Sequence, residues 1–164
     1  MILDYNYLFD GSASAAGGVV GVALTSAGLF TGLASTNVID LVNARDMDVG
    51  EPKIRIMCLV TASFTSTGAA TLQVQAQGST DNTTFTTYSE TPAMIATACT
   101  AGKMIANFDF PGVLPNDGSL PRYLRLRYVN GVSAISAGSV ISALVLGRDM
   151  SPNRNYPSGI TITN

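Results

Sequence analysis

The feature of this chain that most restricts its fold is a two-residue alternation of apolar and polar side chains over residues 71–77. The stretch reads Thr-Leu-Gln-Val-Gln-Ala-Gln, which places Leu72, Val74 and Ala76 on one face and three glutamines on the other. Successive side chains of a strand point to opposite faces, so this pattern is typical of a β-strand with one buried face. A Thr-rich stretch at 84–89 returns after a turn, and the two together predict a β-hairpin.

Further strands are predicted along the rest of the chain. Residues 53–60 begin with the same alternation and then become apolar on both faces, which predicts a strand whose second half is central in a sheet. Strands are also expected at 103–110, 122–129 and 139–146, because Pro-Gly and Asn-Gly turn signals separate them. No window of 11 residues carries a helical stripe. We count roughly eight strands and predict an all-β, single-domain β-sandwich of jelly-roll type.

Two stretches are expected to extend from this core, and we divide residues 1–164 accordingly. Residues 11–36 carry no charge and are rich in Gly, Ala and Ser, which predicts an arm or inserted hairpin before a core at 37–150. Gly, Ser and Thr interrupt the arm too often for a membrane span. The tail at 151–164 ends in Ile-Thr-Ile-Thr, and we expect it to be disordered or, preferably, to add a strand to a neighbour.

The composition argues against several classes of function. Hydrophobic residues make up 46% of the chain and charged residues 12%, about half of the usual ~25%. Uncharged polar residues must therefore supply much of the surface, and neighbours in an assembly often cover such surfaces. A net charge of −2 with nine basic residues argues against nucleic-acid binding. Without histidine the chain lacks the commonest general base and metal ligand, and without tryptophan it lacks the best side chain for stacking on sugars or anchoring an interface.

We find no candidate catalytic, cofactor or metal site. No nucleophile is paired with a base, and Lys53 and Lys103 lie in no known catalytic motif, so we expect no enzyme activity. The acidic group at 46–51 lacks the full register of a calcium loop, and we interpret it as a turn. Cys58 and Cys99 have uncharged neighbours and are predicted to be buried; whether they pair stays open.

Arginines are concentrated in one predicted strand, Arg-Tyr-Leu-Arg-Leu-Arg-Tyr at 122–128. The alternation places Arg125 and Arg127 on the outer face, opposite inward-pointing leucines and Tyr128. A pair of guanidinium groups on one face is suited to an acidic partner surface, although a solvated face is the plain alternative.

Several blocks in succession resemble one family. They are the opening Met-Ile-Leu-Asp, the stretch Ala-Ser-Thr-Asn-Val-Ile-Asp-Leu at 34–41, the Gly-Glu-Pro at 50–52, the arginine-rich strand, and Val-Leu-Gly-Arg-Asp at 145–149. Together they resemble the capsid cement proteins of tailed bacteriophages. The resemblance implies a non-catalytic jelly-roll protein on the outside of an icosahedral head, where it clamps neighbouring major capsid subunits. The chain departs from this pattern in residues 11–33 and in the tail after Asp149.

The leading hypothesis is therefore a virion cement protein, made in the host cytoplasm, since no secretory signal opens the chain. It would sit on the outer capsid surface as a dimer or trimer and bind the major capsid protein, with neither nucleic acid nor membrane as a partner. A carbohydrate- or receptor-binding module on the virion is the alternative, and an exported adhesion subunit is a third. Assembly contacts usually depend on a few aromatic and arginine anchors. The candidates are Tyr5, Tyr7, Phe9, Phe30, Arg125, Arg127 and Tyr156.

Overall fold

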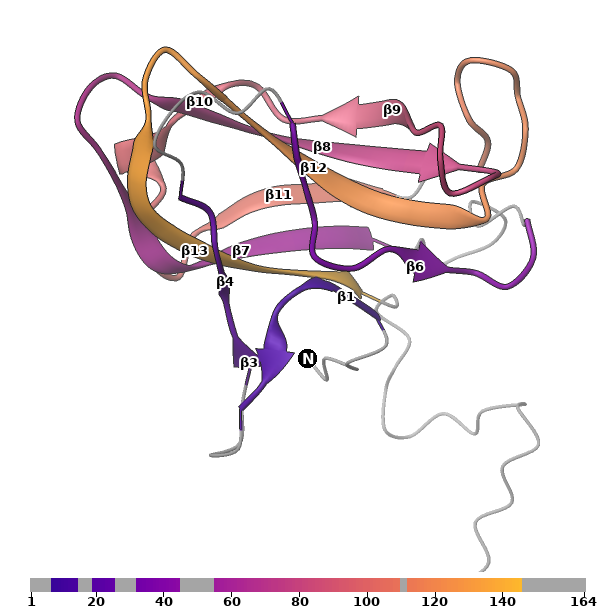
Figure 1. Cartoon of the computed structure of the whole chain (residues 1–164), viewed down its shortest axis with the longest axis horizontal. Coiled ribbons are helices and arrows are strands. Elements are labelled where there is room, and N and C mark those ends of the chain that lie inside the picture. The colour runs from indigo at the N-terminus through magenta and orange to yellow at the C-terminus, as the bar shows by residue number, and fades with distance from the viewer. Residues whose placement is uncertain (1–6, 15–18, 26–31, 45–54, 110–111, 146–164) are drawn as a thin grey trace, which may run out of the picture.

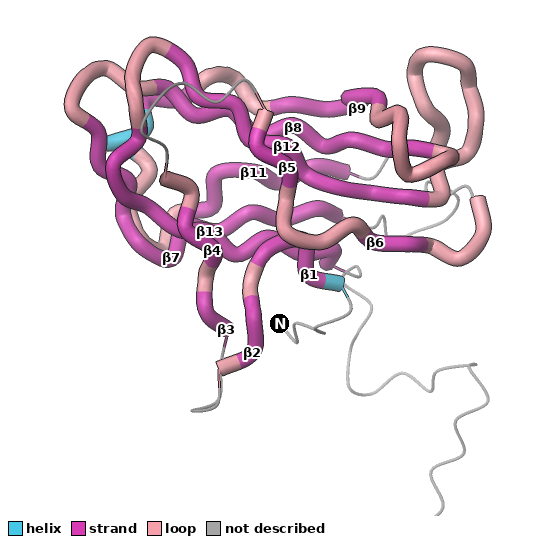
Figure 2. The backbone as a smooth tube through the Cα atoms, in the orientation of Figure 1, coloured by secondary structure: helices cyan, strands magenta, loops and turns pink. Residues whose placement is uncertain are grey.

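A computed structural model describes residues 7–14, 19–25, 32–44, 55–109 and 112–145. Two antiparallel sheets pack face to face, and the strands are joined by turns and loops (Figures 1 and 2). Within these ranges the structure contains no α-helix, only short 3₁₀ turns such as η2 (Ala96–Ala98). The prediction of an all-β sandwich is confirmed.

The first sheet has the strand order β1-β13-β7-β11, and β4 also pairs with β13. Its strand β7 lies between β13 and β11, which confirms that the second half of the predicted 53–60 strand is central. The bounds are β1 (Leu8–Asp10), β4 (Val22–Ala23), β7 (Arg55–Ser66), β11 (Met104–Asp109) and β13 (Ile135–Val145).

The second sheet has the order β10-β8-β12-β5, and β9 and β6 extend it along β8 and β12. Leu72, Val74 and Ala76 are fully buried in β8, so the alternation has the predicted inward face. Strand β9 pairs antiparallel with β8, which confirms the predicted hairpin. The bounds are β5 (Leu33–Ala34), β6 (Ile39–Asp40), β8 (Thr71–Ser79), β9 (Thr86–Glu90), β10 (Met94–Ile95) and β12 (Tyr123–Gly131).

The connections between the sheets follow the jelly-roll pattern. The short strands β5 and β6 share one edge of β12, and β9 and β10 share one edge of β8, so each pair fills a single strand position. The first sheet then consists of β1, β7, β11 and β13 and the second of β5/β6, β8, β9/β10 and β12, and from β5/β6 onward the chain crosses to the other sheet at every step except the β8–β9 hairpin. With four positions in each sheet, this is the double-sheet arrangement predicted from the sequence.

The predicted arm contains a hairpin, although the sandwich begins earlier than expected. Strands β2 (Ser12–Ala13) and β3 (Val19–Val20) form a separate ribbon that projects from the sandwich (Figure 1). On either side of this ribbon, β1 and β4 pair with β13, and β5 pairs with β12. Elements before residue 37 are thus part of the sheets. Residues 151–164 lie outside the described ranges.

The core fills the space between the sheets. Its largest fully buried side chains include Tyr128, Phe9, Ile56 and Leu126. Gly138 lies in β13 with φ +145, at a position where a Cβ atom would come within 2.2 Å of the Phe64 ring. Only glycine fits this approach, because both the space and the backbone conformation exclude a side chain. The register of β13 against β7 shifts on both sides of it.

The two sides of the sandwich differ. On one side the backbone N–H of Asn37 donates to Phe9 O at 2.9 Å, and the Asn37 amide donates to Leu8 O at 3.2 Å, so β1 is tied to the chain entering β6. On the other side β11 and β9–β10 are the outer strands. Among the described residues, β11 pairs only with β7, and β9 and β10 pair only with β8. The sandwich is therefore closed along β1 and open along β11.

Candidate interaction surfaces

The outer face of the second sheet presents the two predicted arginines. Leu124, Leu126 and Tyr128 are fully buried beneath β12, and Arg125 and Arg127 are half-exposed, as the alternation predicted. The Arg125 Nε–H donates to Gln77 Oε1 at 2.8 Å, and the guanidinium lies 3.7 Å from the centroid of the Phe85 ring. Burial is the main cause that lowers the pKa of Arg125, and the positive charge of Arg127 lowers it further. The guanidinium group nevertheless remains charged, as arginines in proteins do. The structure thus holds this cation in one place.

Hydrogen bonds also hold the neighbouring glutamine side chains of this face. The Gln75 amide donates to Glu90 Oε2 at 2.9 Å, and the Gln77 amide donates to Thr87 Oγ1 at 2.8 Å. Cross-strand pairs of this kind link β9, β8 and β12 in a row. Ordered side chains lose less entropy on binding, so this polar face is suited to a protein partner.

A third arginine clamps the end of the same sheet. The Arg122 guanidinium donates to both Asp40 carboxylate oxygens at 2.9 Å and lies 4.8 Å from the Tyr123 ring. The hydrogen bond from Arg122 lowers the pKa of Asp40. This pair joins β6 to the start of β12. The two residues lie 82 positions apart, so no local sequence pattern predicts it.

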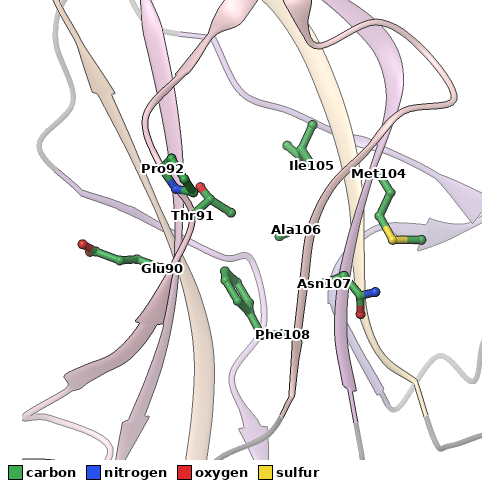
Figure 3. Close-up of a pocket in the computed structure, with 8 residues that line it drawn as sticks. All are labelled: Glu90, Thr91, Pro92, Met104, Ile105, Ala106, Asn107 and Phe108. Carbon is green, nitrogen blue, oxygen red and sulfur yellow. The ribbon is translucent and has the colours of Figure 1, made fainter.

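The open side of the sandwich contains a hollow of about 320 Å³ between β11 and the link from β9 to β10. Figure 3 shows Ile105, Ala106 and Phe108 on the side that faces Thr91 and Pro92, whereas Met104 and Asn107 point the other way. The inward group is almost fully buried, whereas Met104 is 48% exposed. The hollow therefore has an apolar wall on the β11 side, whereas Glu90 and Thr91 add polar groups on the opposite side, and it lies beside an outer strand.

Exposed apolar side chains also line the edge formed by β5 and β6. Leu33, Val38 and Val42 are 39%, 39% and 67% exposed, and Val20 on the projecting ribbon is 52% exposed. Sequence reasoning did not single them out, because isolated valines and leucines on a surface are common.

The candidate aromatic anchors divide into three groups. Phe9 is fully buried in the core, where it presents no surface to a partner, and we withdraw it as an anchor. Phe9 points inward from β1, and this strand of three residues is too short to show a periodicity in the sequence. Tyr7 is half-buried against the core and keeps some surface. The remaining candidates, Tyr5, Phe30 and Tyr156, lie outside the described residues.

A buried carboxylate, Asp10, forms a hydrogen-bonded cluster that no sequence pattern predicts. Asp10 is 1% exposed, and its Oδ2 accepts hydrogen bonds from Tyr128 Oη at 2.5 Å and Ser142 Oγ at 2.7 Å. Its Oδ1 accepts from the backbone N–H and hydroxyl of Thr36 at 2.8 and 3.0 Å. Burial raises the pKa of Tyr128 well above its usual value, which keeps the phenol protonated as a donor. The cluster ties β1 to both sheets.

The described thiols and carboxylates do not cluster into a set of possible metal ligands. Cys58 and Cys99 are buried, unpaired thiols whose pKa values are raised by burial, as predicted for small apolar residues. No group of three His, Cys, Asp or Glu residues lies close enough to hold a metal ion among the described residues. The acidic stretch at 46–51 lies outside those residues. None of the described helices has the length and apolar character to cross a membrane.

Comparison with known proteins adds one finding. The Bbp16 family model matches residues 21–145, which is more than half of the chain. The chain belongs to the Bbp16 family. Bbp16 is a family of phage proteins, which agrees with the resemblance of the sequence to phage proteins. No curated protein matches the chain.

The Bbp16 match extends from the start of β4 to the end of β13. It therefore includes Arg125, Arg127 and the hollow beside β11, which are the surfaces described above. Asp10 and β1 precede it, and residues 146–164 follow it.

Proposed function

We propose that this member of the Bbp16 family is a structural virion protein that binds the outer surface of the capsid and holds neighbouring major capsid protein subunits together. The observation that carries the proposal is a jelly roll from a phage protein family whose outer sheet face is an ordered array of Gln, Thr and Arg side chains. The task needs no catalysis, cofactor or metal. It needs a rigid body that presents the same contacts at many equivalent positions.

The arginine face is the part of the surface that we assign to the capsid. Arg125 is already held by Gln77 and Phe85, so binding an acidic group would cost little additional ordering of this side chain. Guanidinium groups pair with carboxylates in two-point contacts, and arginine is enriched at interfaces. We therefore expect the facing capsid surface to be acidic.

The outer edges of the second sheet, formed by β5 and β6 on one side and by β9 and β10 on the other, support the same proposal in a second way. The unpaired backbone N–H and C=O groups of an edge strand can pair with another chain. In an assembly, such pairing with a neighbouring subunit contributes to binding affinity. We propose that the protein is made in the host cytoplasm and joins the capsid as a dimer or trimer. In that arrangement, symmetry repeats each contact.

Capsids that lack the protein provide the test. The purified protein is mixed with them, the capsids are pelleted, and the bound amount is measured together with the heat or osmotic shock needed to release DNA. We expect saturable binding and a higher release threshold. Failure to bind these capsids would refute the proposal, and a glycan array with the same protein would then test the carbohydrate-binding alternative.

A matched pair of variants locates the contact. Arg125→Gln with Arg127→Gln removes both charges from the outer face of the second sheet, whereas Arg55→Gln removes an exposed arginine from the first sheet. We expect the double variant to bind at least about tenfold more weakly and Arg55→Gln to bind normally. Equal binding by all three proteins would remove the arginine face from the proposal. Thermal unfolding of the free variants checks that they are folded.

A further inference from the structure

The outer edge of β11 combines three properties of a site for an additional strand. Its six residues, Met104–Asp109, contain no proline, and among the described residues the strand pairs only with β7. The opposite outer strands are interrupted by Pro92, which lacks a backbone N–H. Open edges of this length are normally covered or blunted by charge. Within β11 the one charged residue is Asp109, at its end.

The hollow beside this edge has apolar residues in its walls, against which apolar side chains would pack. It measures about 320 Å³, far more than one water molecule needs, and Ile105, Phe108 and Pro92 contribute to its walls. A strand paired with β11 would direct alternate side chains into the gap between the sheets, as Ile105 and Phe108 are directed in Figure 3. Its other side chains would face outward, in line with Asn107.

The chain contains a segment with this pattern beyond its last described residue. Residues 160–163 read Ile-Thr-Ile-Thr, in which two β-branched apolar side chains alternate with two threonines and no charge is present. β-branched residues are favoured in strands because they pack well on a pleated surface. Both isoleucines would fall on one face of a strand.

The geometry of the first sheet places this segment within reach. Val145, the last residue of β13, pairs with Arg55, and Arg55 pairs with Asp109 at the end of β11. The position beyond β11 is three strand spacings from β13, about 14 Å. The fourteen residues at 146–159 span up to about 46 Å when extended, at roughly 3.3 Å per residue. A chain that enters at Asp109 and runs towards Met104 is antiparallel to β11, as in the rest of the sheet.

We propose that residues 160–163 of the same chain pair with the outer edge of β11 and insert Ile160 and Ile162 into the hollow. The first sheet then gains a fifth strand position, and the open side of the sandwich is covered as the side along β1 is. This inference concerns the free protein and does not depend on capsid binding.

Hydrogen exchange of the β11 backbone amides tests the pairing. Three proteins are compared: the full chain, Ile160→Asn with Ile162→Asn, and Thr161→Asn with Thr163→Asn as a control of equal length. We expect outward-facing β11 amides to exchange at least about tenfold faster in the isoleucine variant and at the unaltered rate in the threonine variant. Amides of β7 and β13 serve as internal references, because both strands are paired on each side.

Two further measurements make the outcome decisive. A chain that ends at Asp149 should match the isoleucine variant, and equal exchange of β11 in that chain and in the full chain overturns the proposal. Each protein is also measured at two concentrations tenfold apart. Protection of β11 that is independent of concentration supports pairing within one chain. Protection that rises with concentration identifies a second copy as the source of the strand and overturns the proposal as stated.

Discussion

Replacement of Asp10 by alanine should weaken the fold more than the loss of any exposed carboxylate. Asp10 accepts four hydrogen bonds, two at each carboxylate oxygen, and is 1% exposed. Without it, the fully buried Ser142 hydroxyl loses its acceptor, whereas Tyr128 Oη keeps a longer bond to Ser142 Oγ at 3.1 Å. The Thr36 donors are near the surface, where water can replace the carboxylate.

The magnitude follows from these contacts. A buried donor left without an acceptor costs about 1–3 kcal/mol, and a hydrogen bond to a charged group contributes about 1.5–3 kcal/mol. The alanine variant no longer bears the desolvation cost of a buried carboxylate, and this gain offsets part of the loss. We expect Asp10→Ala to lower the free energy of unfolding by about 2–4 kcal/mol. Asp10→Asn keeps one acceptor oxygen and should lie between the alanine variant and the unaltered protein.

Urea denaturation followed by far-UV circular dichroism measures the loss, with an unchanged slope as the check that both proteins unfold to similar states. Asp109→Ala is the matched control, because this carboxylate is half-exposed and pairs with Arg55 at 3.0 Å at the surface. We expect that control to change stability little. If Asp10→Ala unfolds within about 0.5 kcal/mol of the unaltered protein, the buried cluster does not stabilise the fold as argued.

Three other predictions follow from the described residues. Gly138→Ala should lower stability by about 2–3 kcal/mol, because its Cβ would overlap the Phe64 ring. Gly102→Ala should lower it by only about 1 kcal/mol, because Gly102 has φ +84 but open space around it. Thermal unfolding of both variants tests this difference. A threonine hydroxyl and backbone amides of its turn lower the pKa of Asp81 from 3.8, so its contribution to stability is present above pH 4 and is lost at lower pH. Asp81→Ala should therefore lower the urea midpoint at pH 7, with a smaller difference at pH 2.5. Cys58 and Cys99, both buried with raised pKa values, should resist alkylation at pH 8 until the protein unfolds, as mass spectrometry would show.

The strands β8 and β12 were predictable because each has one face in the core and one outside it. Burial alternates with a period of two over the whole of β12 and over the first six residues of β8, after which β8 is buried on both faces. The short strands β4, β5 and β6 span two residues each, which is only a single repeat of the two-residue alternation. Their positions are set by pairing with β12 and β13, and so they appear only in the structure.

The candidate surfaces were predictable only where a pattern within one strand places their residues. Alternation was enough to place Arg125 and Arg127 on the outer face, because that inference needs only the strand in which they lie. The ion pair of Arg122 with Asp40 joins residues 82 positions apart, and Asp10 contacts Tyr128 and Ser142 over 118 and 132 positions. Phe9 shows the opposite error: an aromatic residue near a terminus was assigned to the surface, but β1 places it in the core.

Stability and recognition are carried by different parts of this sandwich. The side along β1 is closed by a buried carboxylate whose donors come from both sheets, and such a cluster tolerates little change because every polar atom in it is buried or paired. The arginine face lies on the outside, where substitutions leave the core packing intact. A jelly roll of this kind can therefore alter what it binds without altering how it folds. If members of the Bbp16 family bind capsids as we propose, this separation lets the binding face change from one member to another while the core stays the same.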